Sequence, residues 1–220
     1  MGVDVIPDWA AERSQMVKDQ LRGRGIRDPR VLEAMSAIPR EEFVPPEHRV
    51  LSYGDDPVPI GYGQTISQPY MTALMAQELE LKGSETVLEV GAGCGYAAAV
   101  LGALARSVVS LDIVPALVAM ARANLHRTGR DGNVTVIEGD GSVGYPPNAP
   151  YDAISVAAGA PQIPASLLQQ LADPGVLVIP VGELDDQQLR VVTKKAGRTE
   201  TRVSTYCRFV PLRGGEGWNS

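Results

Sequence analysis

The chain has 220 residues, a hydrophobic fraction of 44% and a formal net charge of −6, and this acidic balance argues against a general nucleic-acid binder. Two cysteines and two histidines are too few for a disulfide framework or a structural zinc site, and no apolar run reaches the ~18 residues of a membrane span. The acidic N-terminal segment lacks the basic start of a secretory signal. We therefore expect a cytoplasmic protein that binds no nucleic acid, membrane or metal.

The first forty residues predict two helices, each preceded by a residue suited to begin it. Asp8 can cap a helix that carries Met16, Val17 and Leu21 on one side. Asp28, directly before a proline, can cap the second helix. Together these segments predict an N-terminal helical cap on the fold.

A proline-rich segment and a loop of unusual composition come next. Residues 39–48, PREEFVPPEH, predict an extended connection. Residues 60–71, IGYGQTISQPYM, have the composition of a loop, in which Gly61 and Gly63 allow tight turns. Pro69 suits the first turn of a helix, so we expect a helix to anchor the end of this loop.

From residue 83 onward, short β-rich runs alternate with helical patterns, which is typical of a parallel sheet with crossover helices. The last two runs surround Ala196-Gly197-Arg198 and predict an antiparallel hairpin. We expect one α/β domain over residues 1–220, with a doubly wound, mostly parallel Rossmann-like sheet. Its parts are the cap and connection (1–60), the loop and its helix (61–82) and the core (83–220). The predicted strands are 86–90, 107–111, 134–138, 152–156 and 175–181, and the predicted helices lie near 96–105, 115–128 and 164–172.

The strongest local motif is LEVGAGCGY at 88–96, a glycine-rich turn directly after the first strand of this sheet. Gly91, Gly93 and Gly95 let backbone N–H groups approach a ligand closely, and a purely structural tight turn is the alternative. A dinucleotide fingerprint needs glycine at the position of Tyr96. The glycine spacing therefore favours S-adenosylmethionine over a nicotinamide cofactor.

Two acids follow the second and third strands of the same sheet. Asp112 can accept hydrogen bonds from both ribose hydroxyls of such a cofactor, and the alternative is a helix cap near Pro115. Asp140, in EGDGS, can bind the adenine amino group or belong to an ordinary polar turn. Because the three motifs fall at the carboxyl edge of one sheet, they predict a single cofactor site.

Longer motifs cover nearly the whole chain: GYGQTISQPYM at 61–71, VLEVGAGCGY at 87–96, EGDGSVGYP at 138–146, APYDAISVAAGAP at 149–161, GVLVIPVG at 175–182 and RFVPLRG at 208–214. In these motifs the chain resembles the protein-L-isoaspartate O-methyltransferases, a family of Class I methyltransferases. The resemblance implies methyl transfer from S-adenosylmethionine to the α-carboxylate of isoaspartyl residues in damaged proteins, with S-adenosyl-L-homocysteine as product and repair through a succinimide. Isoaspartyl proteins and peptides are then the partners, and we expect a monomer.

The resemblance also implies roles for single residues. It puts Ser67 beside the substrate carboxylate as the catalytic group, whereas a cap for the helix at Pro69 is the alternative reading. Substrate contacts are implied for Thr65, Ile66, Ser67, Val210 and Pro211. The implied cofactor set is Ile66, Ser67, Gln68, Glu89, Val90, Gly91, Ala92, Gly93, Gly95, Asp112, Ile113, Asp140 and Gly141.

Three positions depart from the residues usual in that family. Tyr70 stands where histidine is common, Cys94 where serine or threonine is frequent, and Asp112 where glutamate is usual. We expect Cys94 to be a packed small residue and not a nucleophile. Two other functions stay open: methylation of normal aspartates in one dedicated peptide, and a non-catalytic module that binds S-adenosylmethionine.

Overall fold

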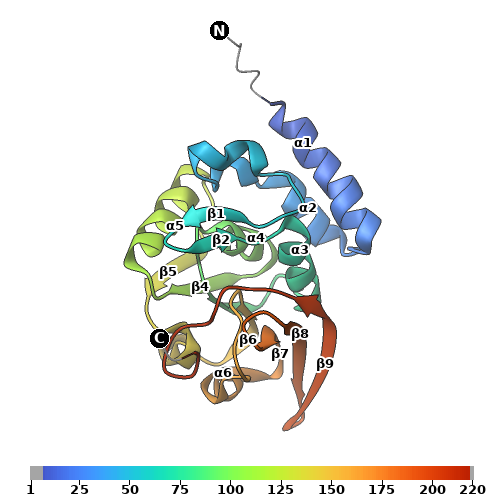
Figure 1. Ribbon diagram of the computed structural model, residues 1–220. Coiled ribbons are helices and arrows are strands. Elements are labelled where there is room, and N and C mark those ends of the chain that lie inside the picture. The colour runs from blue at the N-terminus through green and yellow to red at the C-terminus, as the bar shows by residue number, and fades with distance from the viewer. Residues whose placement is uncertain (1–6, 219–220) are drawn as a thin grey trace.

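A seven-stranded sheet forms the centre of the computed structural model, which describes residues 7–218 (Figure 1). The strand order is β5-β4-β3-β6-β7-β8-β9, with parallel neighbours from β5 to β7 and antiparallel pairs from β7 to β9. The predicted fold class, including the C-terminal hairpin, is confirmed. The strands are β3 (Thr86–Val90), β4 (Ser107–Asp112), β5 (Val134–Glu138), β6 (Tyr151–Val156), β7 (Leu171–Gly182), β8 (Gln187–Lys195) and β9 (Arg198–Cys207).

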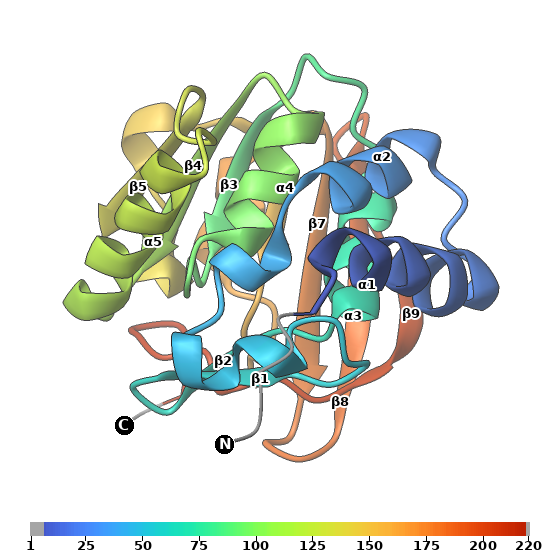
Figure 2. The same cartoon turned by 90° about the horizontal axis from the view of Figure 1, so that it is seen from above.

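Helices cover both faces of this sheet. In β3, the neighbours Val87 and Leu88 point to opposite faces and are both fully buried, as expected for a parallel strand between two helical layers. One apolar cluster joins the Val87 face to the N-terminal helices, α3, α4 and α5, and the other joins the Leu88 face to α6. Figure 2 shows the first group of helices on one side of the strands. The α-helices are α1 (Trp9–Met16), α2 (Pro29–Ala37), α3 (Pro69–Glu78), α4 (Tyr96–Leu104), α5 (Pro115–Arg127) and α6 (Ala165–Gln170).

Both predicted N-terminal caps are present. The Asp8 carboxylate accepts the N–H groups of Ala10 and Ala11 at 3.1 Å each, and that of Asp28 accepts the N–H of Arg30 at 2.8 Å. After α1 the chain continues through a π-helical turn (Val17–Leu21) and a 3₁₀ turn (Arg22–Arg24). The predicted apolar side of the first helix is confirmed, because all three of its residues are buried.

The expectation of an extended connection at 39–48 is wrong. That segment forms 3₁₀ turns at Arg40–Glu42 and Pro46–Leu51, and Pro46, with its fixed φ, is at the first position of the second turn. The expectation of a loop at 60–71 is also wrong in part, because β1 (Val58–Gly61) and β2 (Gln64–Ile66) pair as an antiparallel hairpin. The local sequence shows the turn at the two glycines, but the pairing depends on the core beneath the hairpin.

The predicted helix 164–172 is shorter than expected. It ends at Gln170, and Leu171 already pairs with Tyr151 of the neighbouring strand. The pairing of Leu171 with β6 ends the helix, a contact between distant segments that the local pattern does not show. Among residues 7–218, no helix is both long enough and apolar enough to cross a membrane.

Candidate active site

The site lies where the strand order reverses. From β3 the chain adds β4 and β5 on one side, whereas β6 and β7 extend the sheet on the other side. In open α/β sheets, ligands bind beyond the carboxyl ends of the strands at this reversal. A cavity lies there, between the glycine-rich turn, the end of β4 and the β1–β2 hairpin. Figure 2 shows the hairpin crossing in front of that edge of the sheet.

The glycine-rich turn packs tightly against its surroundings. Gly95 has φ +88°, and a Cβ there would come within 3.1 Å of the backbone oxygen of Ala121 in α5. The N–H groups of Gly91 and Ala92 both donate to the Leu111 carbonyl, at 2.8 and 2.9 Å. These two N–H groups are therefore satisfied within the chain, so a ligand that approaches the turn meets other backbone groups. At Gly91 and Gly93 the turn offers a ligand backbone without a side chain, and Ala92 and Cys94 add small side chains to the cavity wall.

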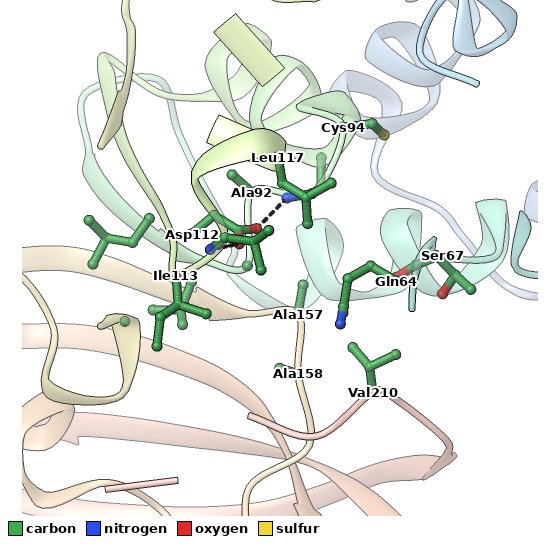
Figure 3. A pocket seen from close by; sticks show the side chains of 18 of the residues that line it. Gln64, Ser67, Ala92, Cys94, Asp112, Ile113, Leu117, Ala157, Ala158 and Val210 are labelled. Carbon is green, nitrogen blue, oxygen red and sulfur yellow. Dashed lines mark hydrogen bonds between the residues drawn. The ribbon is translucent and has the colours of Figure 1, made fainter. Parts of the chain in front are cut away.

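Asp112, at the end of β4, is bonded to that turn. Its Oδ2 accepts the N–H of Gly93 at 2.8 Å, and its Oδ1 accepts the N–H of Val114 at 3.0 Å (Figure 3). Burial raises the pKa of Asp112, against the opposing effect of these N–H donors. The N-cap residue of α5 is Val114, so Asp112 itself is not the cap. Each carboxylate oxygen has a further acceptor position, so Asp112, which lines the cavity, can still receive a ribose hydroxyl.

Asp140, for which adenine binding and a polar turn were both open, forms hydrogen bonds within a turn. It does not line the cavity, although Gly141 does. Its Oδ1 accepts the N–H and hydroxyl of Ser142 at 2.8 and 2.6 Å, and its Oδ2 accepts the N–H of Gly215 at 2.7 Å. Partial burial opposes ionisation, but these hydrogen bonds lower the pKa of Asp140. The observed geometry is that of a polar turn that fastens the C-terminal segment.

Three other expected residues also lie away from the cavity: Gln68, Glu89 and Gly95. Glu89 is fully buried in β3, where Ser110 donates to its Oε2 and Oε1 has no partner in the described chain. Burial raises the pKa of Glu89 to about 8. The remaining expected residues all line the cavity: Thr65, Ile66, Ser67, Val90, Gly91, Ala92, Gly93, Asp112, Ile113, Gly141, Val210 and Pro211.

Ser67 lies at the boundary between the cavity and a neighbouring open groove. Both hollows are lined by Thr65, Ser67, Ala157, Val210 and Pro211. Figure 3 shows Ser67 and Val210 at the end of the cavity opposite Asp112. The N-cap residue of α3 is Gln68, and no side-chain hydrogen bond caps that helix, so the capping alternative for Ser67 is not observed.

The sequence reasoning missed Ala157 and Ala158, which follow β6 and line the cavity. Their signal was their position, directly after the strand that pairs with β3 at the reversal of strand order. Cys94 also lines the cavity, but burial raises the pKa of its thiol to about 11. Such a thiol stays protonated near neutral pH, as expected for a packed residue and not a nucleophile.

The sheet order, the glycine-rich turn after β3 and the acid after β4 define a Class I methyltransferase fold. Residues 11–217 match the family model for protein-L-isoaspartate(D-aspartate) O-methyltransferase (PCMT). The chain belongs to this family, and the resemblance seen in its motifs is confirmed.

Relatives across bacteria and solved structures agree with this assignment. The chain is 56% identical over 214 residues to protein-L-isoaspartate O-methyltransferase 2 of Marinobacter nauticus, covering 96% of this chain and 97% of that protein. It is 51% identical over 219 residues to protein-L-isoaspartate O-methyltransferase 1 of Rhodopseudomonas palustris, and the match covers 99% of this chain and 89% of that protein.

Two solved structures share the fold. One, a putative protein-L-isoaspartate O-methyltransferase of Plasmodium falciparum in complex with S-adenosyl-L-homocysteine, is 29% identical with a TM-score of 0.78, covering 92% of this chain and 98% of that one. A second protein-L-isoaspartate O-methyltransferase is 29% identical with a TM-score of 0.80, and the match covers 93% of this chain and 66% of that chain.

Proposed function

We propose that this protein transfers a methyl group from S-adenosylmethionine to the α-carboxylate of L-isoaspartyl residues in damaged proteins and peptides. The observation that carries the proposal is that the cavity and the neighbouring groove share lining residues, among them Ser67 and Val210. A small cofactor fits the cavity and an extended peptide fits the groove, so the reacting atoms of both would come together at this boundary.

The residues around the cavity suit the cofactor. The Asp112 carboxylate offers acceptors for ribose hydroxyls, and Ile113 and Leu117 offer apolar surface for a flat base. The glycine-rich turn allows a ligand close to the backbone. Among residues 7–218 no cluster of acids, histidines or cysteines suits a metal ion, and methyl transfer from a sulfonium requires none.

The reaction needs positioning more than acid–base chemistry. A carboxylate of pKa about 4 is already an anion at neutral pH, so no general base is required. S-adenosylmethionine, when bound, supplies a methyl group activated by its sulfonium charge. The Ser67 hydroxyl donates a hydrogen bond to one acceptor oxygen and leaves the other free to receive the methyl group. Thr65, Val210 and Pro211 line both hollows at the same point.

The product of this step is a neutral methyl ester together with S-adenosyl-L-homocysteine. The following backbone nitrogen then attacks the ester carbonyl and methanol leaves, which closes a succinimide without further help from the protein, and hydrolysis returns part of it to normal aspartate. The proposed role is therefore repair of isoaspartyl sites.

We further propose that one chain acts alone and in the cytoplasm. The cavity and groove are lined within a single chain, so no second copy is needed to complete the site. Cys94 and Cys207 are both free thiols, which suits a reducing compartment.

The proposal is tested with labelled S-adenosylmethionine and two matched peptides that differ only in isoaspartate or aspartate at one position. Base-labile label on the isoaspartyl peptide alone is expected. Label on the aspartyl peptide alone would instead favour methylation of normal aspartates. Tight cofactor binding without any label would favour a non-catalytic binding module.

A further inference from the structure

Arg40 is a fully buried arginine that touches the acceptor end of the cavity from behind. Its Nη2 donates to the Ser67 carbonyl at 2.8 Å, and its Nε donates to the Ser52 carbonyl at 2.7 Å. Its guanidinium carbon lies 4.9 Å from the centre of the Tyr96 ring. Both Ser67 and Tyr96 line the cavity, so Arg40 connects the hairpin side of the site to the end of the glycine-rich turn.

No carboxylate neutralises this arginine within the described chain. Arg40 forms none of the ion pairs found among residues 7–218, and its Nη1 makes no hydrogen bond there. Its sequence neighbour Glu41 instead interacts with Arg13 and Tyr53. Burial lowers the pKa of Arg40, but arginine stays cationic in proteins.

A buried cation without a partner is costly, and an apolar side chain of similar volume would usually serve the core as well or better. A guanidinium at this place is therefore best explained by something it does for the site. The anion that the proposed reaction brings to this region is the acceptor carboxylate, which would lie against the Ser67 hydroxyl while Arg40 holds the Ser67 carbonyl.

We propose that Arg40 is the positioning residue for the methyl acceptor, fixing Ser67 through its carbonyl and favouring an anionic ligand through its buried charge. This inference rests on the proposed function, since it requires a carboxylate as acceptor. Arg40, although it lies outside the cavity, would then account for part of the preference for an ionised substrate.

Arg30 provides a matched control. It also donates to two backbone carbonyls, Leu81 at 2.7 Å and Leu104 at 2.8 Å, but it is only partly buried, and neither carbonyl belongs to a residue that lines the cavity or the groove. Substitutions of Arg30 should therefore report the structural cost of losing such a pair of bonds, without an effect on the acceptor.

The test uses four variants: Arg40→Lys, Arg40→Gln, Arg30→Lys and Arg30→Gln. Melting temperature, kcat and KM for an isoaspartyl peptide, and Kd for S-adenosyl-L-homocysteine are measured for each. With S-adenosyl-L-homocysteine present, binding of the isoaspartyl peptide is also compared with that of its carboxamide analogue, which is uncharged at the acceptor.

We expect Arg40→Lys to lower kcat/KM for the peptide by about 10–100-fold, as small misplacements do, with less than about a threefold change in Kd for S-adenosyl-L-homocysteine. Arg40→Gln should also reduce the preference for the charged peptide over the carboxamide by about tenfold, whereas Arg40→Lys should retain most of it. Arg30 variants that lose as much melting temperature as the Arg40 variants should keep kcat/KM and the preference for the charged peptide within about twofold of the wild-type values.

Equal effects of the Arg40 and Arg30 substitutions at equal loss of melting temperature would overturn the inference, as would an unchanged charge preference in Arg40→Gln. If Arg40→Gln does not fold, Arg40→Lys alone decides. A loss of kcat/KM for the peptide with little change in Kd for S-adenosyl-L-homocysteine supports the inference, and equal changes in both overturn it. A wild-type protein that labels no isoaspartyl peptide would overturn the proposed function itself, and with it this inference. An active wild type with indistinguishable arginine variants would overturn the inference alone.

Discussion

The backbone N–H of Gly93 donates to Asp112 Oδ2 at 2.8 Å, and this bond ties the glycine-rich turn to the end of β4. One carboxylate thus fixes the shape of the cofactor cavity and also lines it. Substitutions of Asp112 should consequently affect both the turn and the bound cofactor.

Asp112→Asn should weaken binding of S-adenosyl-L-homocysteine by about tenfold, and Asp112→Ala by about 100-fold. Hydrogen bonds to a charged group contribute about 1.5–3 kcal/mol, and asparagine keeps one acceptor oxygen whereas alanine keeps none. Titration calorimetry measures the Kd values. Asp131→Ala, which alters an exposed aspartate that pairs with His126, is the control and should leave Kd unchanged. Equal Kd values for wild type and Asp112→Ala would remove Asp112 from the cofactor site.

Ser67→Ala should lower kcat for the isoaspartyl peptide by about 10–100-fold, with Kd for S-adenosyl-L-homocysteine changed by less than about threefold. The lost hydroxyl orients the acceptor, so its effect belongs to transfer and not to cofactor binding. Steady-state kinetics and calorimetry together measure this difference. Ser36→Ala removes a hydroxyl that donates to the Leu32 carbonyl in α2 and should change neither quantity. Equal losses of transfer and binding in Ser67→Ala would make Ser67 a structural residue.

Glu89 should make the protein less stable as pH rises between about 4.5 and 8. Burial raises its folded-state pKa, so over this range the unfolded chain releases a proton that the folded chain retains. The stability that protonated Glu89 contributes is thus fully present below the pKa of Glu89 in the unfolded chain. It is lost as pH rises to the pKa of Glu89 in the folded chain. Each pKa unit corresponds to about 1.4 kcal/mol, so the total loss is a few kcal/mol.

Glu89→Gln tests this dependence, because glutamine fills the same space and does not titrate. Urea unfolding at several pH values should show that wild type loses stability relative to Glu89→Gln as pH rises from 4.5 to 8. A constant difference between the two proteins across this range would show that Glu89 is ionised in the folded state.

Gly95→Ala should destabilise the protein by about 2–4 kcal/mol, through its positive φ and the contact of the new Cβ with Ala121. Gly197→Ala is the matched control, since Gly197 also has positive φ but lies in open space. It should lose only about 1 kcal/mol, the conformational part of the cost. Thermal or urea unfolding measures both values. Similar losses in the two variants would mean that Ala121 moves away from the new methyl group at little cost.

Much of the fold follows from local sequence. The caps at Asp8 and Asp28, the five parallel strands and the start of α3 at Pro69 all appear where short-range signals predict them. Such features depend on residues within a few positions of one another, because helix caps, proline geometry and strand periodicity act over that distance. For the same reason the strand-end motifs identified the edge at which the cavity lies.

The partners of side chains could not be derived in this way. The sequence places Asp140 at a strand end, but only the folded chain brings Gly215 to its carboxylate. It likewise gives no sign that Arg40 reaches the carbonyl of Ser67, 27 positions away. These contacts form between segments distant in the chain, and the packing of the helical cap and C-terminal segment against the sheet decides them. Local chemistry therefore determined the class of site, and tertiary packing decided which groups face the ligands and which hold the site together.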